Sequence, residues 1–142
     1  MGFEILVSRD LPITTIEDLD EAARRFLSQI GYLRRAEEGA PFQVFRCFLD
    51  RPDKAWVVEE ICASVGVSRP TVYRQIARLK ALDLIEDVGI GGDKGVRRGY
   101  RVRYGSLAKA WNFVEANVEI AMENYRKSVE HIEALAERER RK

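Results

Sequence analysis

Basic side chains cluster in the middle of this sequence. Residues 66–103 contain nine lysines and arginines and four acids, so the segment has a formal charge of +5, whereas the whole chain of 142 residues has a formal charge of +1. Guanidinium and ammonium groups that are set against phosphates release condensed counterions, which favours binding. The local excess of positive charge therefore predicts a surface that faces a polyanion.

The candidate binding residues fall into two groups. The first group lies on a predicted helix over residues 68–82, and the second lies in the glycine-rich stretch that follows. On the helix, Thr71, Arg74 and Arg78 lie opposite the apolar Ile76, so we expect them to face outward. Together the two groups comprise Ser68, Arg69, Thr71, Tyr73, Arg74, Arg78, Lys94, Arg97 and Arg98.

The groups that catalysis or metal binding would require are missing. The chain has one histidine, His131, and two cysteines, Cys47 and Cys62, which do not have a metal-binding spacing. No nucleophile is paired with a base, and the glycine-rich stretch lacks the Gly-Lys-Ser/Thr ending of a phosphate-binding loop. We therefore expect no enzymatic activity, no metal and no cofactor, and we expect the cysteines to be buried as small apolar residues.

Residues 1–40 are predicted to form a helical N-terminal extension. Residues 3–8 are a short apolar run typical of a strand, and residues 14–17 (TTIE) have the pattern of a capping box that starts a helix. Apolar residues then recur on one helical face as far as Gly31, which suits a left-handed helix end. The polar residues 34–41 are expected to form a linker.

A helix-turn-helix is predicted in the centre of the chain. Pro41 suits the first turn of an apolar helix. A short helix is expected over residues 57–65 and a break at Gly66, while Ser68 caps the following helix and Pro70 lies in its first turn. Two helices joined by a short turn that contains glycine form a helix-turn-helix.

A β-hairpin is predicted after these helices. Residues 84–88 and 100–104 have strand character, and the glycine-rich stretch between them would form a long tip. Tyr100, Val102 and Tyr104 alternate with arginines. We therefore expect their face of the second strand to pack on the helices.

The longest periodic run begins at Ser106 and contains neither proline nor glycine after that residue. With Trp111 at heptad position a, apolar residues occupy positions a and d over four heptads except at Ser128, and others widen the stripe at position e. Such a stripe is buried best against a second copy of the helix, so a homodimer is predicted. The predicted dimer interface consists of Trp111, Val114, Val118, Ala121, Met122, Tyr125, Val129, Ile132 and Leu135.

Residues 58–87 resemble the helix-turn-helix of winged-helix transcriptional regulators of the MarR and TrmB type. The matching features are a small residue four positions before the turn glycine, then Gly66-Val67-Ser68, Thr71-Val72 and the exit Leu79-Lys80-Ala81-Leu82-Asp83-Leu84-Ile85. Cys62 replaces the usual alanine and Asp83 the usual glycine. Cysteine fits a close helix crossing and aspartate tolerates left-handed backbone, so neither departure conflicts with the fold. The resemblance covers residues 42–104.

This resemblance implies a mainly α-helical α+β fold with a small β-hairpin wing. The expected domains are the N-terminal extension (residues 1–40), a winged helix-turn-helix domain (41–104) and a C-terminal dimerisation helix (105–142). The resemblance also implies a sequence-specific transcriptional regulator that binds double-stranded DNA as a homodimer. Its recognition helix would lie in the major groove, and its basic wing would contact the backbone or the minor groove.

Three other functions are weighed against the same sequence features. A winged helix can also act as a protein-interaction module in a transcription-related assembly, but an apolar patch on the recognition helix would then be expected, and Arg74 and Arg78 argue against it. An enzyme-like domain with a ligand pocket is disfavoured by the missing catalytic groups. A small-molecule effector bound between the N-terminal helix and the dimerisation helix is compatible with a regulator, although no motif identifies it.

The sequence also predicts a cytoplasmic protein. No apolar run approaches the roughly 20 residues that span a bilayer, and the first residues lack the pattern of an export signal. We therefore expect no membrane association.

Overall fold

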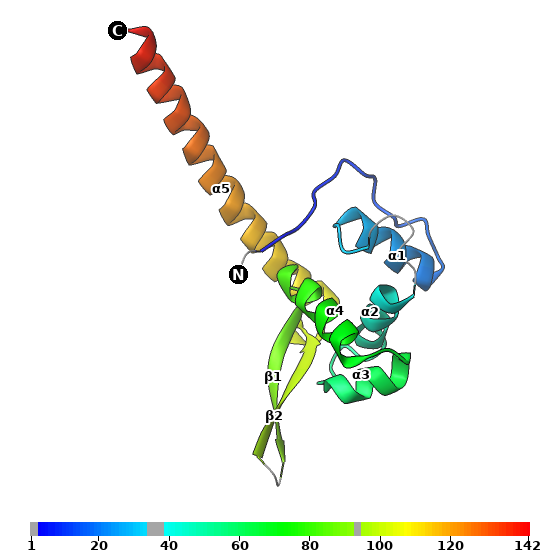
Figure 1. Ribbon diagram of the computed structural model, residues 1–142. Helices are drawn as coiled ribbons and strands as arrows, with labels where there is room; N and C mark the ends of the chain where they lie inside the picture. The colour runs from blue at the N-terminus through cyan, green and yellow to red at the C-terminus, as the bar shows by residue number, and fades with distance from the viewer. Residues whose placement is uncertain (1–2, 34–38, 93–94) are drawn as a thin grey trace.

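The computed structural model describes residues 3–33, 39–92 and 95–142, which form a mainly α-helical α+β fold (Figure 1). Within these ranges there are five α-helices, one antiparallel hairpin and one turn of 3-10 helix. Their bounds are α1 Leu19–Gln29, α2 Ala40–Asp50, α3 Val58–Val65, α4 Arg69–Ala81, β1 Ile85–Gly92, β2 Gly95–Val102, the 3-10 turn Arg103–Gly105 and α5 Leu107–Arg140. The hairpin and α5 project from the helical body in different directions. None of the helices that the structure describes has both the length and the apolarity to cross a bilayer.

Helix α1 begins later than the sequence predicted. The TTIE sequence is not a capping box, and Asp18 caps the helix by accepting a hydrogen bond from the Glu21 amide at 2.9 Å. A carboxylate at this position also complements the positive end of the helix dipole, which favours the later start. Gly31 has a φ of +89°, which confirms the left-handed conformation predicted at the end of this helix.

The apolar run at the N-terminus is extended but is not a strand. Its amides bond to two different elements: that of Glu4 donates to the Ala81 carbonyl of α4, and that of Leu6 donates to the Ile30 carbonyl that follows α1, each at 3.0 Å. A strand needs a continuous ladder to one neighbour, and these single bonds do not form one. The segment instead crosses from α4 to α1.

Helices α3 and α4 form the predicted helix-turn-helix. Helix α3 ends at Gly66, whose φ is +79° and whose amide donates to the Cys62 carbonyl at 2.8 Å. Ser68 then caps α4 through its hydroxyl, which accepts from the Thr71 amide at 3.4 Å, and Pro70 occupies the first turn. These local signals are sufficient to place the two helices and the turn between them.

The hairpin is longer and its tip is shorter than the sequence predicted. The two strands pair from Ile85 with Val102 as far as Gly92 with Gly95, so most of the glycine-rich stretch belongs to the ladder. Gly99 explains part of this pattern. A Cβ at this position would lie 2.5 Å from Ile90 Cδ1 and 3.3 Å from the Trp56 carbonyl oxygen, so a larger residue would force the Ile90 side chain to move.

The junctions on both sides of the hairpin use left-handed backbone. Asp83 has a φ of +62°, at the position where the winged-helix pattern has glycine, and its carboxylate accepts from Asn117 Nδ2 of α5 at 2.7 Å. Tyr104 was predicted to lie in the second strand, and this is wrong, although its ring packs edge-on against Phe113 of α5 with the ring centres 6.2 Å apart. It has a φ of +59° in the 3-10 turn and is 52% exposed, because the chain turns there into α5.

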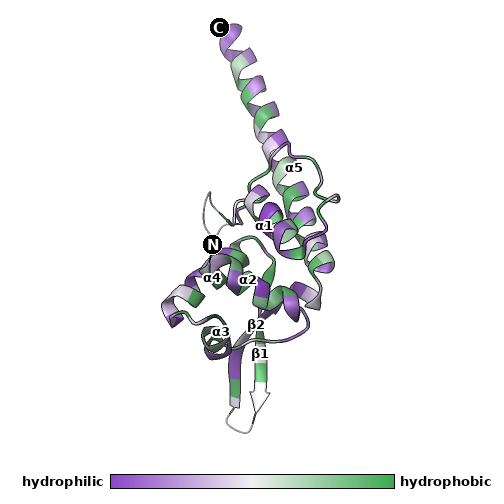
Figure 2. Cartoon of the chain, turned by 90° about the vertical axis from the view of Figure 1, so that its right-hand side faces the viewer, coloured by the Kyte–Doolittle hydropathy of each residue, from purple (hydrophilic) through white to green (hydrophobic). Residues whose placement is uncertain are grey.

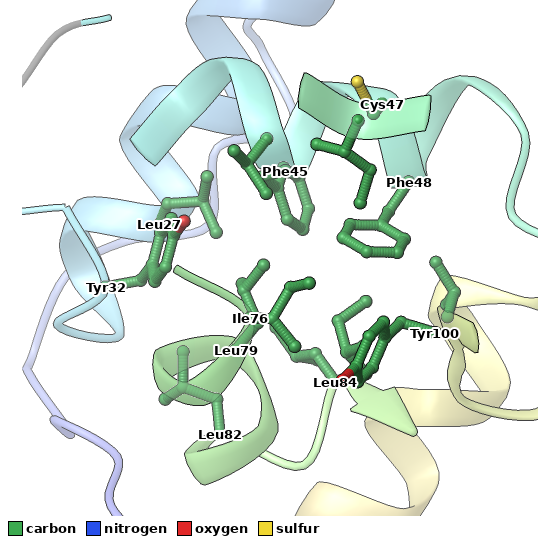
Figure 3. Close-up of a cluster of buried hydrophobic side chains, with 14 of the residues drawn as sticks. Leu27, Tyr32, Phe45, Cys47, Phe48, Ile76, Leu79, Leu82, Leu84 and Tyr100 are labelled. Carbon is green, nitrogen blue, oxygen red and sulfur yellow. The ribbon is translucent and has the colours of Figure 1, made fainter. Parts of the chain in front are cut away.

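The buried core joins the helix-turn-helix to helices α1, α2 and α5 (Figure 3). Phe45 and Phe48 of α2 face Ile76 and Leu79 of α4 across the core. Leu27 of α1, Tyr32 just after α1, and Ala110 and Val114 of α5 complete it. Cys47 is buried, as predicted, and burial raises the pKa of its thiol, although the hydrogen bond that the thiol donates to Ser64 Oγ opposes the shift. Cys62 is only half-buried.

Candidate nucleic-acid interface

Helix α4 has a buried face and an exposed face. Val72, Ile76 and Leu79 are at most 2% exposed and anchor the helix in the core. On the opposite side Arg74 is exposed and Tyr73 is 49% exposed. The centre of the outer face is therefore polar and basic, and it is rigidly supported from behind.

The start of α4 carries hydroxyl groups and an arginine. Ser68, Arg69 and Thr71 lie there, and the Ser68 and Thr71 hydroxyls form a hydrogen bond of 2.9 Å with each other. Ser68 and Arg69 are exposed, whereas Thr71 is half-buried. The positive end of a helix, together with such donors, favours contact with an anionic oxygen.

Arg78 does not face outward, so this prediction is wrong. Its guanidinium donates to the Tyr32 carbonyl and, at 3.1 Å, to Gln75 Oε1. The guanidinium carbon also lies 4.8 Å from the centre of the Tyr32 ring. Tyr32 follows α1 and covers this part of α4. Arg78 thus holds the end of α1 on α4 and does not belong to the candidate interface.

Glu59 of α3 joins two of the candidate binding residues. Its carboxylate accepts a hydrogen bond from Arg69 at the start of α4 and lies 3.5 Å from Arg97 Nη2 of β2. A backbone hydrogen bond and the charges of these two arginines hold the pKa of Glu59 below its usual value. The three side chains are 49% to 63% exposed, so these ion pairs are weak and solvent-screened. A phosphate could replace the carboxylate at small cost.

No sequence pattern indicates this role of Glu59. The two arginines are 10 and 38 residues away from it along the chain. Only the folding of the hairpin beside α3 brings them together.

The wing presents two arginines beyond the body of the protein. Arg97 and Arg98 are exposed on β2, opposite Ile90 and Gly89 of β1. The hairpin extends past α3 and points away from α5 (Figure 1). Lys94, the third predicted binding residue of the wing, lies outside the described residues.

Arg101 of β2 and Arg103 of the 3-10 turn are paired with acids at the base of the wing. Arg101 Nη2 donates to Glu86 at 2.7 Å, and Arg103 lies 3.9 Å from the carboxylates of both Glu86 and Asp83. The Arg103 guanidinium also lies 4.1 Å from the centre of the Phe113 ring of α5. Arg101 thus joins the two strands of the wing, Arg103 joins the base of the wing to α5, and both positive charges are compensated within the protein.

Glu86 should make the stability of the protein depend on pH. Burial by itself raises the pKa of Glu86, but hydrogen bonds from Arg101 and the Tyr104 amide and the charges of Arg101 and Arg103 outweigh it, so the pKa lies below 4.5. A carboxylate with a lowered folded-state pKa stabilises the fold above its unfolded-state pKa, and this contribution is lost as the pH falls through the folded-state pKa. Glu86→Gln should therefore lower the Tm at neutral pH and approach the wild-type Tm in acid.

Thermal unfolding of the two proteins between about pH 3 and about pH 7 measures this difference. The gap in Tm should close below about pH 4.5, where the unfolded-state carboxyl takes up a proton. A gap of constant size across the range would show that the charge on Glu86 does not support the wing.

The outer part of α5 carries an exposed apolar stripe. Met122, Tyr125, Val129 and Ile132 are 60% to 66% exposed and recur at steps of three and four, which places them along one face. Leu135 is 42% exposed beside them. Green and purple segments alternate along this free part of the helix (Figure 2). Such a continuous exposed stripe marks an interaction surface.

The inner part of the predicted interface belongs to the protomer itself. Val114 is fully buried in the core, so its assignment to a dimer interface is wrong. Trp111 packs edge-on against Phe26 of α1, with ring centres 5.5 Å apart, and Val118 is half-buried against the core. Position d of the first heptad therefore faces the protomer's own core.

A groove lies between the N-terminal segment and α5. It has a volume of about 430 Å³, and Ile5, Leu6, Trp111 and Val118 contribute to its apolar lining. Glu115 and Glu119 of α5, together with Asp10, add acidic groups to the lining. The groove lies near the expected effector position between the N-terminal helix and the C-terminal helix, but the extended segment before α1 forms most of its N-terminal side. No cluster of metal-binding side chains occurs among the described residues.

Comparisons with known proteins do not identify a family for this chain. No protein-family model matches it, and no curated protein sequence matches it. One similar solved structure is named as a possible transcriptional regulator from Methanosarcina mazei Go1, at 18% sequence identity and a TM-score of 0.46, over 67% of this chain and 78% of that chain. Any function assigned to this protein therefore rests on the geometry of its own residues.

Proposed function

We propose that this protein is a sequence-specific DNA-binding transcriptional regulator that acts as a homodimer. Each protomer inserts α4 into a major groove and lays its wing along the backbone or the adjacent minor groove. The position of Glu59 carries this proposal, because one carboxylate contacts both Arg69 at the start of α4 and Arg97 on the wing. The basic parts of the two elements therefore lie on the same side of the molecule and can meet one duplex together.

The exposed residues divide into those that read bases and those that position the protein. Arg74 lies on the outer face of α4, and its guanidinium can donate two hydrogen bonds to the O6 and N7 atoms of guanine. Ser68 and Arg69 at the start of α4 suit a phosphate, as does Arg98 on the wing, and such contacts fix the register without reading sequence. Specificity thus depends mainly on Arg74 and its neighbour Tyr73.

The dimer sets the arrangement of the DNA site. A protein with two-fold symmetry that presents one recognition helix per protomer favours a palindromic site, with half-sites separated by one helical turn or a multiple of it. The exposed stripe of α5 provides the surface through which the two copies associate.

Selection of bound duplexes from a random pool tests the DNA-binding proposal directly. We expect recovery of a palindromic sequence. In competition gel-shift assays the protein should bind this sequence more tightly than it binds random duplexes. The logarithm of the binding constant should fall linearly with the logarithm of the salt concentration. Equal competition by random duplexes would refute sequence-specific recognition, and the absence of any shifted band at low salt would refute DNA binding altogether.

Removal of the Glu59 charge should strengthen DNA binding. In the wild type, Arg69 and Arg97 must give up the Glu59 carboxylate when they bind phosphate, and in Glu59→Gln this cost is absent. The substitution also removes one negative charge from the interface. We expect an affinity about twofold to fivefold higher for all duplexes, because exposed ion pairs are individually weak. Fluorescence anisotropy titrations at one fixed salt concentration measure the effect.

Glu60→Gln provides the matched control for this substitution. Glu60 is adjacent on α3, but its carboxylate pairs with Lys54 at 2.8 Å and accepts from the Val57 amide at 3.1 Å. It should therefore change DNA affinity less than Glu59→Gln does. Weaker binding by Glu59→Gln than by the wild type would mean that the carboxylate orients the arginines for DNA instead of competing with it.

A further inference from the structure

The charges of α5 are distributed unevenly along its length. Residues 115–123 contain three glutamates and no basic residue, whereas residues 138–142 contain four basic residues and one acid. Between these two charged segments lies the exposed apolar stripe that was described above. Two copies in parallel would bring acid next to acid and base next to base. Antiparallel copies would bring opposite charges together at both ends.

We infer that the second copy binds antiparallel along α5, with the two-fold axis near Val129. This inference rests on the homodimer of the proposed function and specifies its geometry. In this register Met122 of one copy meets the partner's Ala136, and Tyr125 lies beside the partner's Ile132. The apolar stripe is approximately symmetric about Val129, so each large side chain meets an apolar side chain of the partner.

Charged residues beside the stripe support the same orientation. Glu115, Glu119, Arg126 and Glu133 follow one another at steps of four and seven and therefore line one flank of the stripe. When two helices pack antiparallel face to face, like flanks meet, so Arg126 lies next to the partner's Glu133. The other flank carries uncharged residues such as Ala121 and Ser128. A parallel pair would set this uncharged flank against the charged one and form no such ion pairs.

The groove beside α5 lies where the partner's basic segment ends in this register. Glu115 and Glu119 line the groove, and the partner's Arg140 and Arg141 come opposite these two glutamates. The apolar lining from Trp111 and Val118 suits the aliphatic stems of arginine side chains. The occupant of the groove is thus the basic last turn of a second copy of this chain, and the acidic lining is the feature that selects it.

Crosslinking of single-cysteine substitutions distinguishes the two orientations. Met122→Cys, Val129→Cys and Ala136→Cys are made in the full chain and treated with a bismaleimide of about 10 Å reach, with the wild type as background for Cys47 and Cys62. In the antiparallel dimer Val129→Cys crosslinks to itself. Met122→Cys alone and Ala136→Cys alone do not crosslink, because two copies of either residue lie about 21 Å apart along the helix axis. When the two variants are mixed, the new cysteine at position 122 of one copy crosslinks to the one at position 136 of the other. Self-crosslinking of Met122→Cys would overturn the antiparallel arrangement.

Charge reversal tests the same geometry by sedimentation of the full chain. Glu115→Lys with Glu119→Lys should weaken the dimer about threefold to tenfold, and adding Arg140→Glu with Arg141→Glu to the same chain should restore it. In a parallel dimer the first pair of substitutions would not weaken association, because Glu115 and Glu119 would have no basic partner to lose, and that result would also overturn the inference.

These outcomes separate the inference from the proposed function. A dimer that crosslinks in the parallel pattern contradicts the antiparallel geometry but leaves the DNA-binding homodimer standing. A chain that stays monomeric in sedimentation at all concentrations contradicts both the geometry and the homodimer. Gel-shift assays with the selected duplex report on DNA recognition in either case.

Discussion

Replacing Arg74 by alanine is expected to reduce affinity for the selected DNA site by about 1 to 3 kcal/mol, which corresponds to roughly 5-fold to 150-fold. Arg74 is exposed on the outer face of α4, and the buried Val72 and Ile76 hold that helix from behind. A guanidinium that makes two hydrogen bonds to one guanine loses both in the alanine variant, so discrimination at that base pair should also relax. Anisotropy titrations with the selected duplex and its single-base variants measure both effects.

Arg78→Ala is the matched control on the same helix. Arg78 is one turn further along α4, but it donates to the Tyr32 carbonyl and to Gln75 Oε1. Its removal leaves partly buried acceptors with fewer partners, so we expect the free energy of unfolding to fall by about 1 to 3 kcal/mol. Arg74→Ala should leave the unfolding free energy within about 0.5 kcal/mol of the wild type, since it changes an exposed position.

The two variants thus separate recognition from folding. At a temperature where both are folded, Arg78→Ala should bind the selected duplex with nearly wild-type affinity. A loss of affinity in Arg78→Ala that exceeds the loss in Arg74→Ala would show that the wrong side of α4 has been assigned to DNA.

Val129→Asp is expected to convert the homodimer into a monomer. Val129 is 60% exposed at the centre of the α5 stripe, where a second copy would bury it, and an unpaired carboxylate in an apolar interface is strongly unfavourable. Loss of the second DNA-binding domain removes the avidity of two linked half-sites, which amounts to about 10²-fold or more. Sedimentation should give the mass of a single chain, and gel shifts with the palindromic duplex should require correspondingly more protein.

Ala134→Asp introduces the same charge on the same helix but on another face. Five residues along an α-helix correspond to about 140° of rotation, so Ala134 points away from the stripe. This variant should remain dimeric and should bind DNA like the wild type. Both variants should have the circular dichroism of a folded protein, because both positions are exposed. Dimeric Val129→Asp would show that the stripe is not the dimer interface.

The helix-turn-helix could be predicted because its signals are local. Gly66 adopts the left-handed conformation that ends α3, and Ser68 accepts the hydrogen bond that starts α4, with Pro70 in the first turn. Each signal depends on atoms that are only a few residues apart, so the sequence contains all the information needed. The start of α1 was predicted incorrectly. The TTIE pattern predicts a cap at residues 14–17, whereas the Asp18 side chain caps the helix in the structure.

The hairpin was predicted correctly, but the predicted lengths of its strands and tip were wrong. Glycine has a low strand propensity, so the glycine-rich stretch has the pattern of a long tip. In the folded protein Gly99 packs against Ile90 of the opposite strand, and the ladder continues to Gly92 and Gly95. Contacts between the two strands decide where the strands end, and the residue pattern along one strand does not reveal these contacts.

The tertiary structure alone decided which charged and apolar residues remain available for partners. Helical periodicity places Arg74 and Arg78 on similar faces, but Tyr32, 46 residues before Arg78 in the sequence, covers only the second of them. In the same way Val114 follows the dimer pattern and is buried by the protomer's own core. The sequence determined the helices, the turn and the local excess of positive charge, because caps, backbone conformation and side-chain periodicity act over a few residues. Packing between distant segments determined exposure, because a side chain loses contact with solvent only when another part of the chain folds over it.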